Sequence, residues 1–318
     1  MAKKYAFLFP GQGAQAQGMM KDVCDAFPEA RKVIDDISAI TGKDITKLLW
    51  ETEQTELNRS DNSQLAITAG SLAVMAALKS KGIEPSAAMG FSLGEFPALY
   101  AAGILSFEDV IKIVVQRGSI MQKVCEDIAA ANEGHAPGMT AVLGLPPEKV
   151  EELAKGVEGA YAANMNSVKQ TVVSGTFDGL AAVEEAAKNA GARRTVRLAV
   201  AGPFHSPLMQ AAADGFKTAL EPYSFCDPKI TLFSNVTGKK VTEGAAAKAS
   251  AVDHLTNPVR WTAEEKVLAD MINEDKDNEW VILEVGPGKV LSGLWGQTEL
   301  GASLACTPIN TAEAIQAL

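Results

Sequence analysis

A five-residue segment, Gly90–Gly94, places one serine between two glycines in the pattern G-x-S-x-G. An apolar run, residues 87–91, precedes Ser92, and residues 94–102 have the composition of a helix. This order predicts a strand, a sharp turn and a helix, the context that exposes a serine hydroxyl as a nucleophile. The glycines lack the Cβ atoms that would clash in the turn, and the start of the helix favours negative charge. The other interpretation is a serine that only caps the helix.

A serine nucleophile needs a base, because a free hydroxyl is a weak nucleophile at neutral pH. The three histidines are His135, His205 and His254. His205 follows a predicted strand, where active-site groups gather in α/β proteins, so it is the first candidate and His254 the second. His135 lies in a polar linker, and no carboxylate stands out as a third member. We therefore favour a Ser92–His205 pair oriented by a backbone carbonyl over a full triad.

The overall charge and the cysteines exclude several functions. The chain has 318 residues, of which 39 are acidic and 29 basic, with a formal net charge of −10. An acidic protein is a poor general partner for nucleic acid. The four cysteines are far apart and form no C-x-x-C pair, so we expect no metal, no cofactor and a reducing compartment. No apolar run is long enough for a membrane span, and we expect a cytoplasmic protein without membrane contact.

The elements that must position Ser92 and His205 follow an α/β pattern. Short buried strands are predicted at residues 5–9, 87–91, 230–234 and 280–285, with helices between them, including helices at 19–38 and 63–81 and one that begins near Phe204. A Gly/Gln loop follows the first strand, but it lacks the Gly-Lys-Ser/Thr ending of a phosphate loop. We therefore reject nucleotide binding there.

The middle of the chain has a different organisation. A polar segment that contains glycine and proline begins near residue 132. The pattern beyond it is β-α-β-β-α-β, which is the ferredoxin-like arrangement. We expect residues 131–198 to form an inserted small domain, and residues 1–130 and 199–318 to form a large α/β domain with a central parallel sheet.

Six separated motifs together point to a family. In chain order they are Phe9-Pro10-Gly11-Gln12-Gly13, Gly90-Phe91-Ser92-Leu93-Gly94-Glu95, Gln116-Arg117-Gly118, Phe204-His205-Ser206, Asn257-Pro258-Val259-Arg260-Trp261 and Glu284-Val285-Gly286-Pro287-Gly288. Their order resembles that in malonyl-CoA:acyl carrier protein transacylases, and the resemblance spans nearly the whole chain. It implies a hydrolase-like large domain with a ferredoxin-like insertion.

The resemblance also implies a reaction. Malonyl would move from CoA to the phosphopantetheine thiol of acyl carrier protein by a ping-pong route, for fatty acid or polyketide synthesis. Ser92 would carry the malonyl ester, and His205 would act as general base and then as general acid. The backbone N–H groups of Gln12 and Leu93 would form the oxyanion hole. Arg117 would hold the malonyl carboxylate, for which a guanidinium is suited.

Other positions are implied less directly. Phe204 resembles the residue of malonyl-selective enzymes, and its ring would crowd a 2-methyl group. The family usually has Gln at the position of His254, whose backbone carbonyl would orient the catalytic histidine, and His at the position of Phe91. Asn166 would contact the substrate. Weaker candidates for the phosphopantetheine arm or the CoA phosphates are Asn164, Arg193 and Arg194.

Two other functions are weighed against this one. A serine esterase or thioesterase would use the same turn, but the lack of a clear acid and the Arg117 motif disfavour it. A non-catalytic carrier-binding protein is disfavoured by the intact Ser92, His205 and Arg117 set. The expected partners are therefore malonyl-CoA and acyl carrier protein, and a family tendency suggests a monomer.

Overall fold

A six-stranded sheet forms the centre of the molecule in the computed structural model, which describes residues 2–318. The strand order is β10-β9-β1-β2-β7-β8, and only the β7–β8 pair is antiparallel. The strands are β1 (Ala2–Phe9), β2 (Pro85–Gly90), β7 (Thr231–Ser234), β8 (Lys239–Val241), β9 (Asn278–Val285) and β10 (Cys306–Ile309). The prediction of an α/β fold around a central, mostly parallel sheet is confirmed.

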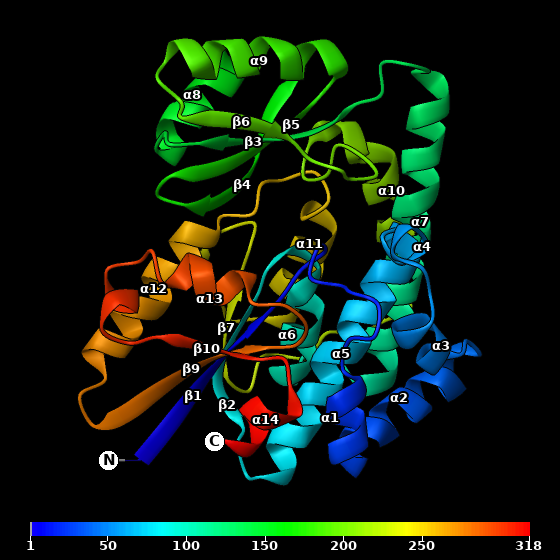
Figure 1. Cartoon of the computed structure of the whole chain (residues 1–318), viewed down its shortest axis with the longest axis vertical. Coiled ribbons are helices and arrows are strands. Elements are labelled where there is room, and N and C mark those ends of the chain that lie inside the picture. Colours follow the sequence, from blue (N-terminus) through cyan, green and yellow to red (C-terminus); the bar gives the residue numbers. More distant parts are fainter. Residues whose placement is uncertain (1) are drawn as a thin grey trace.

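Helices cover both faces of this sheet (Figure 1). They are α1 (Lys21–Ala26), α2 (Pro28–Thr41), α3 (Ile45–Trp50), α4 (Gln54–Leu57), α5 (Ser60–Ser80), α6 (Glu95–Ala101), α7 (Phe107–Ala131), α10 (Gln210–Leu220), α11 (Gly244–Asp253), α12 (Trp261–Glu274), α13 (Val290–Trp295) and α14 (Ala312–Gln316). Phe7 and Phe9 of β1 pack on the face with α2, α5 and α7, whereas Ala6 and Leu8 pack on the face with α12 and α13. This burial on both faces explains why the strand is apolar throughout.

The structure corrects several predicted elements. The helix predicted at 19–38 is divided at Phe27, because Pro28 starts a new helix. The helix predicted near Phe204 begins instead with a short 3-10 turn, Pro207–Met209, which leaves His205 in the preceding loop. The strands β8 and β10 and the short helices α3, α4 and α14 carry too few residues for a clear periodic pattern, and the sequence did not indicate them.

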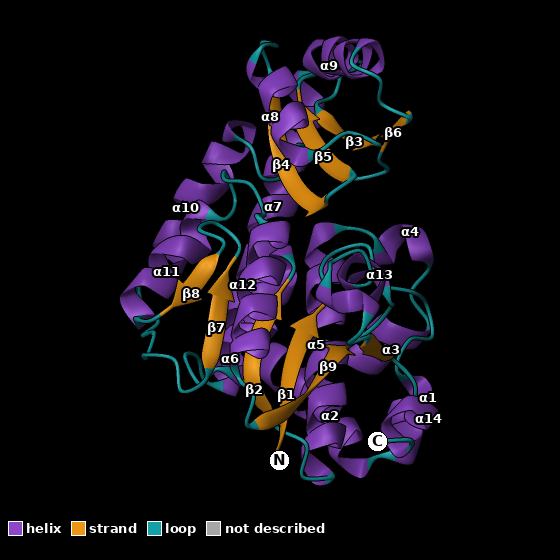
Figure 2. Cartoon of the chain, turned by 90° about the vertical axis from the view of Figure 1, so that its left-hand side faces the viewer, coloured by secondary structure: helices purple, strands orange, loops and turns teal. Residues whose placement is uncertain are grey.

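A second, antiparallel sheet lies beyond the carboxyl ends of β1, β2 and β7 (Figure 2). Its strand order is β4-β5-β3-β6, the ferredoxin-like order that was predicted. Its elements are β3 (Gly138–Leu143), α8 (Pro147–Lys155), β4 (Ala160–Ser167), β5 (Gln170–Gly175), α9 (Phe177–Asn189) and β6 (Arg194–Arg197). The two helices share a small core with one face of this sheet. The domain boundaries at 130/131 and 198/199 stay a prediction.

Strand β4 of the small sheet is bound to a loop segment of the large α/β part of the chain. The N–H of Val259 donates to the carbonyl of Ala163 at 2.8 Å, and the N–H of Met165 donates to the carbonyl of Val259 at 2.9 Å. Val259 lies in the segment between α11 and α12, five residues after His254. The edge of the small sheet therefore fixes the segment that carries His254.

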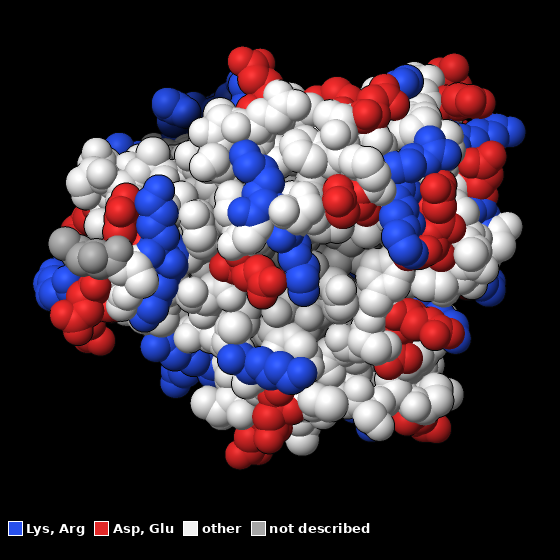
Figure 3. All heavy atoms as spheres, turned by 90° about the horizontal axis from the view of Figure 1, so that it is seen from below, with Lys and Arg blue, Asp and Glu red and all other residues white. Residues whose placement is uncertain are grey.

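Two further features of the molecule are its surface charge and the length of its helices. Acidic and basic side chains are interspersed on the face that Figure 3 shows. Within residues 2–318, no helix is long and apolar enough to cross a membrane.

The turn after β2 depends on two glycines. A Cβ on Gly90 would lie 1.9 Å from the carbonyl oxygen of Gly94, and a Cβ on Gly94 would lie 2.1 Å from the carbonyl oxygen of Phe9. Between them Ser92 has a φ of 51°, in the left-handed region that a non-glycine residue rarely adopts. The end of β2 therefore turns sharply against the end of β1, and only hydrogen fits at both glycine positions.

We predict that Gly94→Ala destabilises the fold by about 3 kcal/mol, because the methyl group overlaps backbone that cannot move away. Gly293→Ala is the matched control. Gly293 lies in α13, where an added methyl group would meet no described atom within 4 Å outside the backbone of its own helix, so the change should stabilise by about 0.5–1 kcal/mol. Urea unfolding monitored by circular dichroism measures both effects. Equal midpoints for the two variants would contradict the prediction.

Candidate active site

A cavity of about 510 Å³ lies between the two sheets. It is lined by the loop after β1, the turn after β2, helix α7, strands β4 and β5, and the loop that carries His205. The predicted site residues that line it are Gln12, Ser92, Arg117, Asn166, Phe204 and His205. Residues from distant parts of the chain thus meet at the carboxyl edge of the large sheet, as ligand sites of open α/β sheets do.

Ser92 and His205 form a hydrogen-bonded pair in this cavity. The Oγ of Ser92 lies 2.8 Å from Nε2 of His205, and Nδ1 of His205 lies 2.8 Å from the backbone carbonyl oxygen of His254. A carbonyl oxygen can only accept, so Nδ1 carries the proton and Nε2 is free to accept from the serine hydroxyl. The arrangement is a serine–histidine pair oriented by a backbone carbonyl.

The surroundings keep His205 neutral. Burial, followed by the positive charge of Arg117, lowers the pKa of His205 to about 4, although its hydrogen bonds to the carbonyls of His254 and Asn257 act in the opposite direction. The imidazole is therefore neutral at pH 7, and its Nε2 is able to take a proton from Ser92.

The loop of His205 is held in a strained shape. His205 has a φ of 58°, the same left-handed region that Ser92 occupies. The hydroxyl of Ser206 donates to the carbonyl of Pro203 at 2.6 Å, and the hydroxyl of Ser174 on β5 donates to the carbonyl of Phe204. Such strain persists only where the surroundings fix it, and these two hydroxyls do so from both sides of the loop.

Arg117 brings a buried positive charge to the same cavity. Its side chain is 1% exposed and lies 5.2 Å from the centre of the Phe96 ring, and its Nη1 donates to Oε1 of Gln64 at 2.7 Å. Its Nε and Nη2 have no hydrogen-bond partner among the described residues. Burial lowers its pKa to about 10, and nearby Glu95 opposes that shift, so the group is charged at pH 7. A guanidinium with two unused nitrogens is suited to bind a carboxylate.

Gly118 lets Arg117 reach this depth. A Cβ at Gly118 would lie 2.9 Å from the carbonyl oxygen of Ser60. Helix α7 therefore packs closely against the start of α5, which supplies Gln64. The Gln116-Arg117-Gly118 motif thus combines the charged group with the small residue that places it.

The two candidate oxyanion donors lie on neighbouring loops. Gln12 follows β1 and lines the cavity, and Leu93 directly follows Ser92 and is buried. A Cβ on Gly11 would lie 2.4 Å from the carbonyl oxygen of Phe91, so these loops approach more closely than a side chain would allow. Phe91 itself packs edge-on against Trp261, with ring centres 5.3 Å apart. Phe91 therefore has an apolar packing role at the position where the family usually has His.

His254 lies behind His205 and is fully buried. Its ring centre is 5.0 Å from that of His205, and its Nδ1 is 3.5 Å from Oε2 of Glu95. Burial, His205 and Arg117 lower the pKa of His254 well below its ordinary value. Burial raises the pKa of Glu95 to about 8, partly offset by a hydrogen bond from the Asn235 backbone and by Arg117. At pH 7 the ring is therefore neutral and most of the carboxyl is protonated.

The remaining candidate substrate-binding residues fall into two groups, one inside the Ser92 cavity and one outside it. Phe204 is 7% exposed and lines the cavity, where Asn164 and Asn166 also lie on β4. Arg193 and Arg194, by contrast, line a separate hollow at the α9–β6 edge together with side chains of α9. The structure does not bring these two arginines to the Ser92 cavity.

Sequence reasoning missed the residues beneath the turn. Asn235 is fully buried, and its Oδ1 accepts from the N–H of Ser92 at 2.7 Å. Gln64, Glu95 and Glu264 are also buried around the site. Their only signal in the sequence was a polar residue within, or directly after, a very apolar element.

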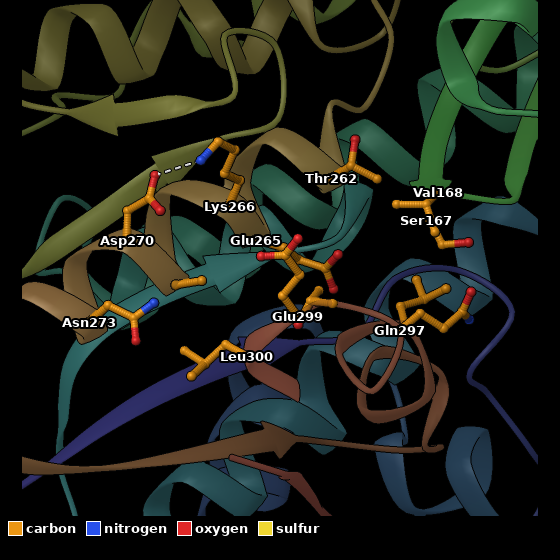
Figure 4. A pocket seen from close by; sticks show the side chains of 13 residues that line it. Ser167, Val168, Thr262, Glu265, Lys266, Asp270, Asn273, Gln297, Glu299 and Leu300 are labelled. Carbon is orange, nitrogen blue, oxygen red and sulfur yellow. Dashed lines mark hydrogen bonds and ion pairs between the residues drawn. The ribbon is translucent and has the colours of Figure 1, made fainter. Parts of the chain in front are cut away.

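A second cavity, of about 300 Å³, lies between α12, α13 and the β4–β5 turn (Figure 4). Glu265 of α12 is buried there, and burial raises its pKa to about 8, with the nearby Trp261 side chain acting in the opposite direction. Leu294 lines both cavities. None of the site residues predicted from the sequence, all within the described chain, lines this second cavity.

The comparisons with known proteins agree with this geometry. Residues 6–287 match the family model described as acyl transferase domain. The malonyl CoA-acyl carrier protein transacylase of Bacillus subtilis is 38% identical over 296 residues, which are 92% of this chain and 89% of that protein. The corresponding protein of Haemophilus influenzae is 37% identical over 300 residues, which are 92% of this chain and 91% of that protein.

Solved structures are similar over nearly the whole chain. The malonyl CoA-acyl carrier protein transacylase of Coxiella burnetii matches with a TM-score of 0.90 and 30% identity, covering 100% of this chain and 97% of that one. A malonyl-transacylase solved in complex with a type II PKS acyl-carrier protein matches with a TM-score of 0.88 and 33% identity, covering 98% of both chains. The chain therefore belongs to the acyl transferase family.

Proposed function

We propose that this protein is a malonyl-CoA:acyl carrier protein transacylase, which moves malonyl from CoA to the phosphopantetheine thiol of acyl carrier protein. The observation that carries the proposal is the Ser92–His205 pair in one cavity with the buried guanidinium of Arg117. The named activity of the relatives supports it. An esterase would need only the pair, whereas the guanidinium selects an acyl group that bears a carboxylate.

In the first half-reaction, Nε2 of His205 takes the proton of the Ser92 hydroxyl as Oγ attacks the thioester carbonyl. The N–H groups of Gln12 and Leu93 hold the oxyanion that forms. The C–S bond then breaks, and the sulfur of CoA leaves with the proton from His205. Malonyl is now an ester of Ser92, and His205 is neutral again.

The second half-reaction reverses these steps with a different thiol. His205 takes the proton from the phosphopantetheine thiol of the carrier protein, and the sulfur attacks the ester carbonyl. The C–O bond breaks, and Oγ of Ser92 regains the proton. A thioester is made from a thioester, so the overall reaction is close to balanced and reversible.

Arg117 and Phe204 would select the acyl group. The free Nε and Nη2 of Arg117 would bind the malonyl carboxylate, and this contact would also hold the ester in place until a thiol arrives. The ring of Phe204 would exclude a 2-methyl group, which makes methylmalonyl a poor substrate. Asn166, whose Oδ1 has no partner among the described residues, would contact the bound substrate.

The setting of the enzyme is also part of the proposal. All four cysteines, each within residues 2–318, are free thiols, which supports a reducing cytoplasm. We propose a monomer that supplies fatty acid or polyketide synthesis.

The proposed function is tested with malonyl-CoA labelled in the malonyl group. The expected result is one label per protein on Ser92, which is located by peptide mass and then passes to added acyl carrier protein. Ser92→Ala should take no label, and Ser303→Ala, at an exposed serine that does not line the cavity, is the control that should be labelled like the wild type. Rapid release of the label to water would indicate a hydrolase, and no labelling of the wild type would refute the proposal.

We predict that Arg117→Ala lowers kcat/KM for malonyl-CoA by about 100- to 1,000-fold, because a buried carboxylate loses its partner. Acetyl-CoA has no carboxylate, so its slow acylation should change much less. Arg31→Ala removes an exposed arginine that pairs with Asp35 on α2 and serves as the control, with wild-type kinetics. Equal losses for malonyl-CoA and acetyl-CoA would show that Arg117 acts on the fold or on His205 rather than on the carboxylate.

We predict that His254→Gln moves the alkaline side of the pH–rate curve for Ser92 acylation to lower pH. The pKa of Glu95 is raised to about 8, so the carboxyl loses its proton as pH rises through that value. We expect this loss to cause the fall of the acylation rate on the alkaline side of the curve. A glutamine amide can donate a hydrogen bond to the ionised carboxylate, which lowers this pKa. The backbone carbonyl that orients His205 is retained. Stopped-flow acylation between pH 5 and 10 measures the curve, and superimposable curves would contradict the prediction.

A further inference from the structure

The pairing of β2 with β7 ends before β2 reaches the turn. The two strands are paired at Ala87 and Ala88, opposite Thr231 and Leu232. Beyond this point the carbonyl of Gly90 and the N–H of Ser92 still face the β7 side, where β7 no longer runs alongside. Gly90 is buried and Ser92 is half-buried at this point, and backbone groups withdrawn from water need partners.

The side chain of Asn235 supplies both partners. Asn235 directly follows β7 and is fully buried. Its Nδ2 donates to the carbonyl of Gly90 at 2.7 Å, and its Oδ1 accepts from the N–H of Ser92 at 2.7 Å. In a parallel sheet, one residue bonds in this way to the carbonyl and the N–H on either side of its opposite residue. The amide therefore takes the place of a strand residue opposite Phe91.

Neighbouring groups fix the orientation of this amide. Nδ2 of Asn235 also donates to Oε1 of Glu264 at 2.9 Å, so both of its hydrogens are used. The backbone N–H of Asn235 points to Oε2 of Glu95 at 3.4 Å, and its carbonyl accepts from the N–H of Arg260 at 2.9 Å. A flipped amide would place N–H against N–H and oxygen against oxygen. The site therefore accepts only one orientation, and a carboxylate lacks the two donors it needs.

We propose that Asn235 is a positioning residue for the acylation of Ser92. Its two hydrogen bonds fix the two peptides that flank Phe91 and thereby hold the left-handed φ of 51° at Ser92. That conformation directs Oγ to His205 and sets the direction of the next N–H, that of Leu93, toward the oxyanion. Asn235 touches neither the acyl group nor the reacting atoms. The choice of malonyl-CoA as the substrate rests on the proposed function, whereas the hydrogen bonds of Asn235 do not depend on it.

Asn235→Asp is the sharpest variant, because it keeps the shape and the acceptor and replaces two donors by a titratable group. The introduced carboxyl would face Glu264 from α12 and the carbonyl of Gly90. Glu95 from α6 lies at the backbone N–H of the same residue, with His254 and Arg117 of α7 beside Glu95. Glu264 itself has a raised pKa, caused by burial and then by Glu95. Two buried carboxyls so close favour the protonated form of a third. Protonated, it can donate to Gly90; ionised, it repels that carbonyl.

The experiment measures the rate constant of Ser92 acylation by malonyl-CoA, the KM for malonyl-CoA and the circular dichroism of each protein from pH 5 to pH 9. A fluorophosphonate that reacts with activated serines is used in parallel as a second probe. For Asn235→Ala at pH 7 we expect an acylation rate about 100-fold lower, similar to the loss of an oxyanion donor, with KM within about threefold of wild type. For Asn235→Asp we expect near wild-type rates at pH 5 that fall at least tenfold by pH 9, with unchanged circular dichroism.

The matched control is Asn278→Asp, which makes the same change at the start of β9, where Nδ2 donates to Oδ1 of Asp275 at 2.7 Å, far from the cavity. It should follow the wild-type pH profile. Wild-type rates for folded Asn235 variants, or a raised KM with an unchanged rate constant, would overturn the inference. The inference would also be overturned if Asn235→Asp lost activity only at the pH at which it unfolds. This outcome applies even if Asn235→Ala does not fold. Wild type that reacts with the fluorophosphonate but not with malonyl-CoA would refute the proposed function, and the fluorophosphonate rates would still test Asn235.

Discussion

The burial of one positive charge, that of Arg117, acts on three titratable groups around Ser92: His205, His254 and Glu95. A guanidinium without water requires nearby groups that tolerate it, and its presence lowers the pKa of both His205 and His254 while it opposes the rise of the Glu95 pKa. Burial is the larger cause of the neutral base, and the same charge adds to it while the guanidinium itself is left in need of an anionic partner. A substrate carboxylate meets that need, so one buried charge contributes both to substrate choice and to the state of the base.

The site is assembled where several chain segments end. The turns after β1 and β2 meet through glycines, because a Cβ at Gly94 or Gly11 would overlap the backbone of the neighbouring segment, and a Cβ at Gly90 would overlap the backbone of its own turn. Ser92 and His205 then adopt left-handed conformations that their surroundings must hold. The strain lies on the two residues whose atoms exchange the proton, and hydrogen bonds from β5 and from the residue after β7 keep each of them in place.

The sequence predicted most of the fold, because the strands that matter are buried on both faces and are apolar throughout. It predicted the turn at Ser92, since glycine spacing records a backbone conformation, and it limited the base to few candidates, since only three histidines are present. It did not predict β10 or β8, which are short, nor the division at Phe27. It missed Asn235 and Glu264 because a single buried amide or carboxyl has no periodic signal, and only tertiary structure reveals which backbone groups it serves. Arg193 and Arg194 were placed by their position in the chain, but they line a separate hollow at the α9–β6 edge.

The edge of the small sheet holds both histidine segments at once. Ala163 and Met165 of β4 bind the segment that follows His254, and Ser174 of β5 binds the loop of His205. The hydrogen bond from Nδ1 of His205 to the carbonyl of His254 thus joins two segments that are both bound to the small sheet. A tilt of that sheet that widens the cavity would move these segments and change the distance between Nε2 of His205 and Oγ of Ser92. The width of the cavity entrance and the distance between the base and the nucleophile would then change together. A bulky acyl chain that forces the sheet outward would therefore also separate His205 from Ser92.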